Sequence, residues 1–179
     1  MFAFLALTFA GLSLQDSIVN VDLFKEDKLY SVLIRLVPIP KVTPPKVAFA
    51  VQLSKEITKL GSHQIIVYDK VFLNDGNGFD VRHGHFTAPV KGVYLLSVII
   101  YTDRNNDLSL DLLKNGQAVI FLYVNGNTDR ASSTIVLPIL LQQGDMVWVR
   151  THAGNEGKAL PGSSQYMLNA FTGALLYAL

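Results

Sequence analysis

VYLLSVIIY, residues 93–101, is the most strand-like segment of the sequence, because eight of its nine residues are aliphatic or aromatic. A strand points alternate side chains to opposite faces. One face of this segment carries Val93, Leu95, Ser97, Ile99 and Tyr101, and the other carries Tyr94, Leu96, Val98 and Ile100. An antiparallel sheet with one face in water alternates apolar and polar residues. This segment does not, so we expect both of its faces to be covered.

The last segment of the chain has the same property. One face of residues 166–179 carries Phe171, Leu175, Tyr177 and Leu179, and the other carries Leu168, Ala170, Ala174 and Leu176. Such strands are either covered on both sides by their own chain or covered on one side by another copy of it. Burial of one Leu or Phe contributes about 1.5–3 kcal/mol. Because both segments show the pattern, we predict a permanent oligomer.

Short apolar runs separated by turn residues fill the rest of the chain after residue 46. We expect further strands at residues 47–53, 108–113, 118–124, 133–141 and 146–150. Asn115-Gly116 predicts a tight hairpin, because a type I′ turn needs positive φ at both central positions. Residues 74–78 and 125–127 are expected to be loops. Many strands without a convincing helix predict an all-β sandwich or barrel.

Composition excludes several classes of protein. The 179 residues include 15 Lys and Arg against 14 Asp and Glu, a net charge of +1. This balance indicates neither nucleic acid nor an anionic membrane as a partner. No stretch reaches the roughly 18 apolar residues of a membrane span. The chain contains no cysteine, which excludes disulfides, thiolate zinc sites and a cysteine nucleophile.

The region before residue 46 is predicted to contain two segments. Residues 1–16 are apolar and uncharged before Asp16, and they are typical of a secretory signal peptide. A buried N-terminal strand is the alternative. Residues 17–45 are expected to form a short stalk and linker, since residues 17–37 have partial helical spacing and four prolines follow by residue 45. Residues 46–179 then form the globular domain, and the protein is expected to be secreted.

No catalytic constellation is present. The sequence lacks a Gly-x-Ser-x-Gly elbow, a phosphate-binding loop and a dinucleotide fingerprint, so we expect a protein that is not an enzyme. Asp103, Asn105 and Asp107 are weak candidates for calcium, whose ligands are oxygens. A solvated turn is the alternative, and no cofactor is expected. The other charged loop residues are candidates for ligand binding: Arg104, Asp129, Arg130 and Lys158.

The order of several motifs along residues 47–179 resembles the globular head domain of the complement C1q family, within the tumour-necrosis-factor-like superfamily. The most recognisable stretch is Phe86-Thr87-Ala88-Pro89 followed by Lys91-Gly92-Val93-Tyr94. The other matching landmarks are Val47-Ala48-Phe49, Tyr68, Asn74, Phe79, Lys114-Asn115-Gly116, Gly144-Asp145-Met146-Val147-Trp148 and Phe171-Thr172-Gly173-Ala174-Leu175-Leu176. Tyr68, Leu96 and Val98 depart from the family's usual residues but remain apolar, and changes at Leu96 and Val98 are expected to affect the subunit contact.

The resemblance implies a jelly-roll sandwich of about ten antiparallel strands that assembles as a homotrimer. It implies a structural or trimer-forming role for Phe86, Gly92, Tyr94, Leu96, Val98, Phe171 and Gly173. It also implies a secreted recognition protein without catalysis, with lectin-like binding of microbial polysaccharide or another cell-surface ligand in innate immunity. The alternative is an extracellular matrix component or a receptor-binding signalling ligand. Ligand contacts are expected on loops, which a trimer presents three times.

Overall fold

The computed structural model describes residues 18–25, 28–35 and 45–179. The chain divides into two compact units, residues 1–43 and residues 44–179. The predicted signal peptide and the proline-rich part of the linker lie outside the described residues. Among the residues that are described, there is no helix long and apolar enough to cross a membrane.

The first unit contains a two-stranded antiparallel hairpin. Strand β1 (Ile18–Lys25) pairs with β2 (Lys28–Arg35) in continuous register, from Ile18 opposite Arg35 to Lys25 opposite Lys28. The partial helical spacing of this segment is therefore not realised. The strands are rich in β-branched residues, which favour extended backbone over helix.

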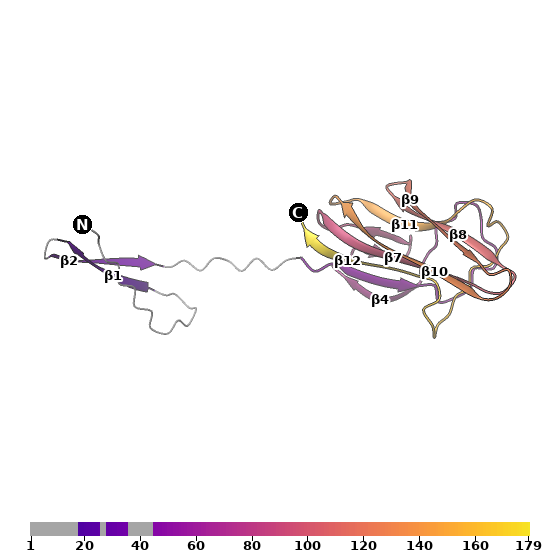
Figure 1. The fold of residues 1–179 in the computed structure, drawn as a ribbon, viewed down its shortest axis with the longest axis horizontal. Helices are drawn as coiled ribbons and strands as arrows, with labels where there is room; N and C mark the ends of the chain where they lie inside the picture. Colours follow the sequence, from indigo (N-terminus) through magenta and orange to yellow (C-terminus); the bar gives the residue numbers. More distant parts are fainter. Residues whose placement is uncertain (1–17, 26–27, 36–44) are drawn as a thin grey trace. The chain divides into compact units, whose positions relative to one another are not determined.

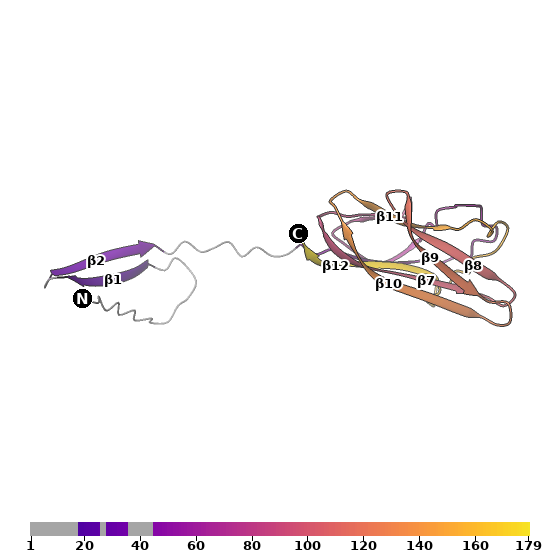
Figure 2. The same ribbon diagram turned by 45° about the horizontal axis from the view of Figure 1, so that its top comes forward.

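The second unit is a sandwich of two five-stranded antiparallel sheets, which agrees with the predicted fold class and strand number (Figures 1 and 2). The first sheet has the order β10 (Ala131–Leu141), β7 (Gly92–Thr102), β12 (Ala170–Ala178), β3 (Ala48–Gln52) and β4 (Lys70–Asp75). The second sheet has the order β5 (Phe79–Asp80), β6 (His85–Thr87), β11 (Met146–Thr151), β8 (Asp107–Lys114) and β9 (Gln117–Asn125). Neighbouring strands are mostly distant in sequence, as in a jelly roll.

The core lies between the two sheets and is built around an aromatic cluster. The ring of Phe49 lies 4.5 Å from that of Phe86 and 4.8 Å from that of Phe171. A side chain at Gly173 would clash with this cluster, because a Cβ there would lie 2.4 Å from the Phe49 ring. The buried Tyr94 hydroxyl donates a hydrogen bond of 2.8 Å to the carbonyl of Val90.

The two faces of β7 have different environments, and this changes one sequence prediction. Tyr94, Leu96, Val98 and Ile100 are completely buried in the core of their own chain. Leu96 and Val98 were expected to have a structural role or to affect the subunit contact, and their side chains point between the sheets, so they contribute to the core and can affect a contact between copies only indirectly. The opposite face is only partly covered, and 37% of Leu95 is exposed there. Any contact between copies through β7 therefore uses this second face.

Candidate functional site

Two loops meet at one end of the sandwich, opposite the C-terminus (Figure 1). Strand β7 starts at Gly92, which pairs with Ala178, and ends at Thr102, which pairs with Ala131. The loop 103–106 after β7 and the loop 126–130 after β9 are therefore both far from the chain end. Four of the seven charged or polar loop residues singled out in the sequence lie in direct contact here.

The backbones of these loops hold each other in place. The Asn105 amide donates to the carbonyl of Gly126 at 2.8 Å, and the Gly126 amide donates to the carbonyl of Asn106 at 3.0 Å. A Cβ on Gly126 would lie 2.4 Å from the Asn106 oxygen, so only glycine permits this approach. Asn105 has a φ of 61°, a conformation that asparagine adopts more readily than most residues. The charged side chains therefore project from a fixed base.

Two ion pairs cross between the loops. The Arg104 guanidinium lies 3.2 Å from the Asp129 carboxylate, and the Arg130 guanidinium lies 3.4 Å from that of Asp103. All four side chains are more than half exposed, so the pairs add little to stability. The four residues line one shallow hollow. They offer N–H donors beside carboxylate acceptors, a combination that fits a hydroxyl-rich ligand because each hydroxyl both donates and accepts.

Neighbouring groups favour the charged form of one acidic member of this cluster, Asp129. The backbone amide of Arg130 and the Arg104 guanidinium lower the pKa of the Asp129 carboxyl. The Tyr101 hydroxyl donates a hydrogen bond of 3.1 Å to Asp103. Partial burial, together with the Asp103 charge, raises the pKa of Tyr101. At neutral pH Asp129 is therefore a carboxylate, and Tyr101 is a neutral phenol.

Lys158 and Asp107 form a separate pair. The Lys158 ammonium donates to both the backbone carbonyl and the carboxylate of Asp107, each at 3.0 Å. This contact lowers the pKa of Asp107. The three calcium candidates do not converge, because Asp103 faces Arg130, Asp107 faces Lys158 and Asn105 lies in the turn between them. Within the described residues, no group of three or more His, Asp or Glu side chains is arranged to hold a metal ion.

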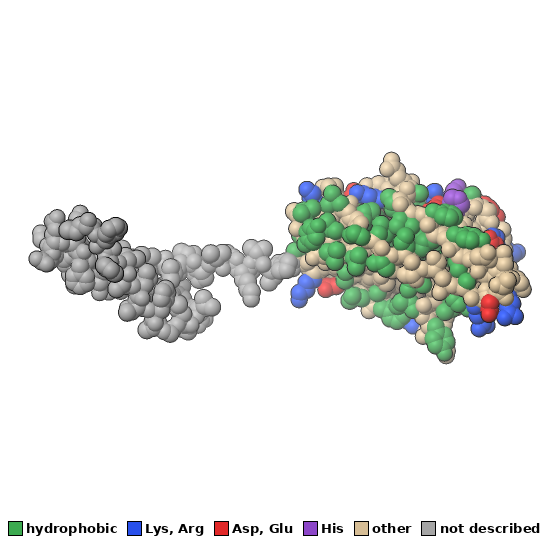
Figure 3. All heavy atoms as spheres, viewed as in Figure 1, with side chains coloured by type: hydrophobic (Ala, Val, Ile, Leu, Met, Phe, Trp, Pro, Cys, Tyr) green, Lys and Arg blue, Asp and Glu red, His purple; other side chains and the backbone are tan. Residues whose placement is uncertain are grey.

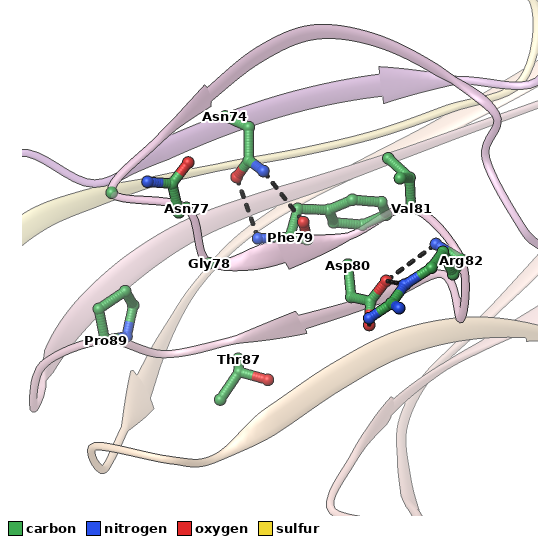
Figure 4. Close-up of a pocket in the computed structure, with 10 residues that line it drawn as sticks. Asn74, Asn77, Gly78, Phe79, Asp80, Val81, Arg82, Thr87 and Pro89 are labelled. Carbon is green, nitrogen blue, oxygen red and sulfur yellow. Dashed lines mark hydrogen bonds and ion pairs between the residues drawn. The ribbon is translucent and has the colours of Figure 1, made fainter.

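A second polar hollow lies beside β5, and sequence reasoning missed it (Figure 4). The Asn74 side chain lines this hollow and is held by two hydrogen bonds of 3.0 Å, one accepted from the Phe79 amide and one donated to the Phe79 carbonyl. Asp80 accepts from His83 at 2.8 Å and from the Arg82 amide at 2.9 Å, and these contacts lower its pKa strongly. The sequence did contain a signal for this hollow, namely three closely spaced charged or titratable residues after a glycine-rich turn: Asp80, Arg82 and His83.

The outward face of the first sheet is apolar and hollowed. Its centre carries small side chains and its rim carries large ones. The centre consists of Ala48, Ala50, Ser97, Thr172 and Ala174, and the rim includes Leu73, Leu95 and Val136. Val136 is 57% exposed and Leu73 is 46% exposed. Figure 3 shows hydrophobic side chains gathered on this side of the sandwich, over β12 and β7. We call this surface the apolar face.

Comparison with known proteins agrees with this architecture. A family model for the C1q domain matches residues 48–176. Heavy metal-binding protein HIP of Mytilus edulis is 32% identical over 134 residues, which cover 73% of this chain and 61% of that protein. Complement C1q tumor necrosis factor-related protein 3 of Homo sapiens is 33% identical over 138 residues, which cover 75% of this chain and 53% of that protein. The chain thus spans just over half the length of these relatives.

Solved structures show the same fold. The globular domain of zebrafish complement 1qA has a TM-score of 0.61 at 22% identity, and the match covers 75% of this chain and 100% of that domain. The Eiger TNF of S. frugiperda also has a TM-score of 0.61, at 14% identity, and the match covers 75% of this chain and 95% of that one. At these identities the likeness establishes the architecture of the sandwich alone.

Proposed function

The chain belongs to the C1q domain family, and on that premise we propose that it is a secreted, non-catalytic recognition protein whose trimer binds surface polysaccharides of microbes. The observation that supports this most is the contrast between two surfaces of the sandwich. The apolar face is suited to contact with another copy of the chain, whereas the charged loops at the far end are suited to a polar ligand. Secretion is part of the proposal and rests on the apolar segment 1–16.

The apolar face supports the trimer on energetic grounds. Leu73, Leu95 and Val136 are each between one third and three fifths exposed in the isolated chain. Burying the exposed part of each contributes about 1 kcal/mol, given about 25 cal/mol per Å² of apolar surface. In a trimer, each of the three copies would bury its apolar face against its neighbours around a common axis. Trimers are also typical of the C1q and TNF-like domains that this chain matches.

The loop cluster supports the ligand class. Arg104, Asp129, Arg130 and Asp103 present donors and acceptors in alternation over a shallow hollow, which favours a polyhydroxylated sugar over an apolar molecule. One such exposed site binds weakly. A trimer presents it three times, so binding to a repetitive surface gains from multivalency.

The trimer is tested by sedimentation equilibrium of the secreted protein. We expect the wild type to have three times the subunit mass. Val136→Glu places a carboxylate on the apolar face, and burying it in a trimer costs several kcal/mol per copy, so this variant should dissociate. Val81→Glu, at an exposed position outside that face, should remain trimeric. A monomeric wild type, or a trimeric Val136→Glu variant, would contradict the proposal.

The ligand is tested on a glycan array and on whole bacteria. We expect saturable binding that the double variant Arg104→Ala, Arg130→Ala weakens at least tenfold while the trimer persists. Arg82→Ala removes an exposed arginine outside the cluster and should bind normally. Unchanged binding by the double variant would place the ligand elsewhere. Binding to matrix proteins or a cell receptor alone would favour the alternative of an extracellular structural or signalling protein.

A second candidate function is metal-ion binding. The mussel relative is named a heavy metal-binding protein. In this chain the specific observation in its favour is a pair of partly exposed imidazoles, His63 and His152, whose ring centroids lie 6.5 Å apart. Titration of the tag-free protein with Zn²⁺ or Cu²⁺ in a calorimeter tests it. Absence of saturable heat with either ion would reject this function and leave the recognition role untouched.

A further inference from the structure

A buried carboxylate lies on the outward face of the second sheet. Asp111 on β8 is only 3% exposed, although alternate side chains of this strand face away from the core. Its cross-strand neighbours are Arg150 on β11 and Phe121 on β9. It accepts a hydrogen bond of 2.9 Å from Nδ1 of His152 and one of 3.3 Å from Nε of Arg150. A buried charge needs such partners, so Asp111 holds both side chains in fixed positions.

The contact with Asp111 determines which nitrogen of His152 is available. An ionised carboxylate only accepts hydrogen bonds, so Nδ1 of His152 carries the proton and donates it. In the neutral ring Nε2 then keeps its lone pair, and 44% of this side chain is exposed to solvent. Histidines that bind metals almost always donate their other ring N–H to a carboxylate or carbonyl in this way. His152 therefore has the orientation and tautomer of a metal ligand.

His63 supplies a second imidazole at a suitable distance. Its ring is inclined by 79° to that of His152 at a centroid separation of 6.5 Å. With metal–nitrogen bonds of about 2.0–2.1 Å, two imidazoles on one ion have centroids about 5–6 Å apart. The observed separation is therefore longer than that of two bound imidazoles, and the proposed site requires the His63 ring to move toward His152. The φ of His63 is 52°, in the left-handed region that costs a residue other than glycine free energy.

The loop that carries His63 is fastened to the strand that leads into His152. The Thr151 hydroxyl donates to the Gly61 carbonyl and accepts from the Gln64 amide, both at 2.7 Å. The carboxylate of Glu156 accepts from the Gly154 amide at 2.9 Å. A negative charge beside the imidazoles favours a cation there.

The other two of the four histidines are less suitable. His83 also donates to a carboxylate, that of Asp80 at 2.8 Å, but it lies in an exposed turn and its neighbouring imidazole is that of His85. Nε2 of its neighbour His85 is buried and has no hydrogen-bond partner, and the ring packs at 4.8 Å against Trp148. An ion from solvent does not reach that nitrogen. The pair His83 and His85 is thus the matched control within the same chain.

We propose that His63 and His152 are the two protein ligands of an open site for a divalent transition-metal ion, Zn²⁺ or Cu²⁺, and that Asp111 is the residue that positions His152. This inference rests on the second candidate function given above. Imidazole suits these ions better than it suits Ca²⁺ or Mg²⁺. Two protein ligands leave the remaining coordination positions to water, so the ion exchanges readily with solvent.

The test is isothermal titration of the tag-free full-length protein with Zn²⁺ and with Cu²⁺, and with Ca²⁺ as the ion that should not bind there. We expect one transition-metal ion per subunit. His63→Ala and His152→Ala should each lower its affinity at least tenfold, whereas His83→Ala should leave it unchanged. The electron paramagnetic resonance spectrum of the Cu²⁺ complex should show coupling to two imidazole nitrogens, and to one after either substitution.

Asp111→Asn tests the positioning role. It should weaken metal binding about 10–100-fold, as loss of such a partner does, while both nitrogens remain in the Cu²⁺ spectrum. Thermal unfolding of each variant verifies that it is folded. If the wild type binds no transition metal, the second candidate function and this site fail together. If it binds metal and His63→Ala and His152→Ala bind equally well, the function stands and the assigned site is wrong.

Discussion

Substitution of Asn169 by alanine tests how β12 joins the end of β7. Asn169 is completely buried just before β12. Backbone pairing between β12 and β7 stops at Ala170 and Ile99. Beyond that point the Asn169 side chain pairs with the backbone of Tyr101, accepting from its amide at 2.8 Å and donating to its carbonyl at 3.1 Å. It also donates to the Pro161 carbonyl at 2.8 Å.

The expected cost follows from these three hydrogen bonds. Each contributes about 0.5–1.5 kcal/mol net, and its loss leaves a buried backbone group unpaired. We therefore expect Asn169→Ala to lower the free energy of unfolding by about 3 kcal/mol. In a domain of this size that corresponds to a fall of about 10 °C in Tm.

The assay is thermal and urea unfolding at one fixed protein concentration, because association with other copies also stabilises the fold. Asn127→Ala, at an exposed position in the loop after β9, is the control and should change stability by less than about 0.5 kcal/mol. Equal effects of the two substitutions would refute the reasoning, since they would mean that the Asn169 side chain does not complete the pairing of β7.

Three other substitutions have defined outcomes. Gly126→Ala places a Cβ 2.4 Å from the Asn106 oxygen and should cost about 1–3 kcal/mol in thermal unfolding, with faster amide exchange in the loop 103–106. Tyr68→Phe removes a buried hydroxyl without a partner and should raise the urea midpoint, by about 1 kcal/mol in stability. Asp145→Asn should lose about 2 kcal/mol at pH 7, because its surroundings, chiefly the Asn115 amide, lower the Asp145 pKa to about 2.

The pH dependence of the last effect has a definite sign. A carboxyl whose pKa is lower in the folded state stabilises the fold above its unfolded pKa, which is 3.8 for Asp145. That stabilisation is lost as the pH falls from about 4 to about 2. The difference between wild type and Asp145→Asn in urea unfolding should therefore shrink over this range. A difference that stays constant down to pH 2 would contradict the assignment, as would an unchanged Tm for Gly126→Ala or a less stable Tyr68→Phe.

Strands with long apolar runs could be predicted from the sequence, and short polar ones could not. The hairpin at Asn115-Gly116 has the expected positive φ at both residues. Strands β5 and β6 lie among Asn, Asp, Gly and His residues that oppose strand formation in isolation. They form because Phe79 and Phe86 are drawn into the aromatic cluster around Phe49, a contact that local sequence does not reveal.

The sites were predictable to different degrees. Charge and turn composition marked the loops that carry Arg104 and Arg130, but not the crossed pairing with Asp129 and Asp103, which depends on the close approach at Gly126. The link between His63 and His152 joins residues 89 positions apart, and the hydrogen bonds of Thr151 with Gly61 and Gln64 bring them together. Periodicity also could not tell which face of β7 is internal, because both faces are apolar.

The position of the chain ends has a practical consequence. The Leu175 amide donates to the carbonyl of Val47, and the Leu179 amide donates to that of Lys91, so both ends of the sandwich chain lie at the start of β7. This strand has 11 residues, and at about 3.3 Å per residue it separates them from the loop cluster by roughly 35 Å. A biotin tag, fluorescent protein or sensor linker attached at either end should therefore leave the opposite tip unobstructed for binding measurements.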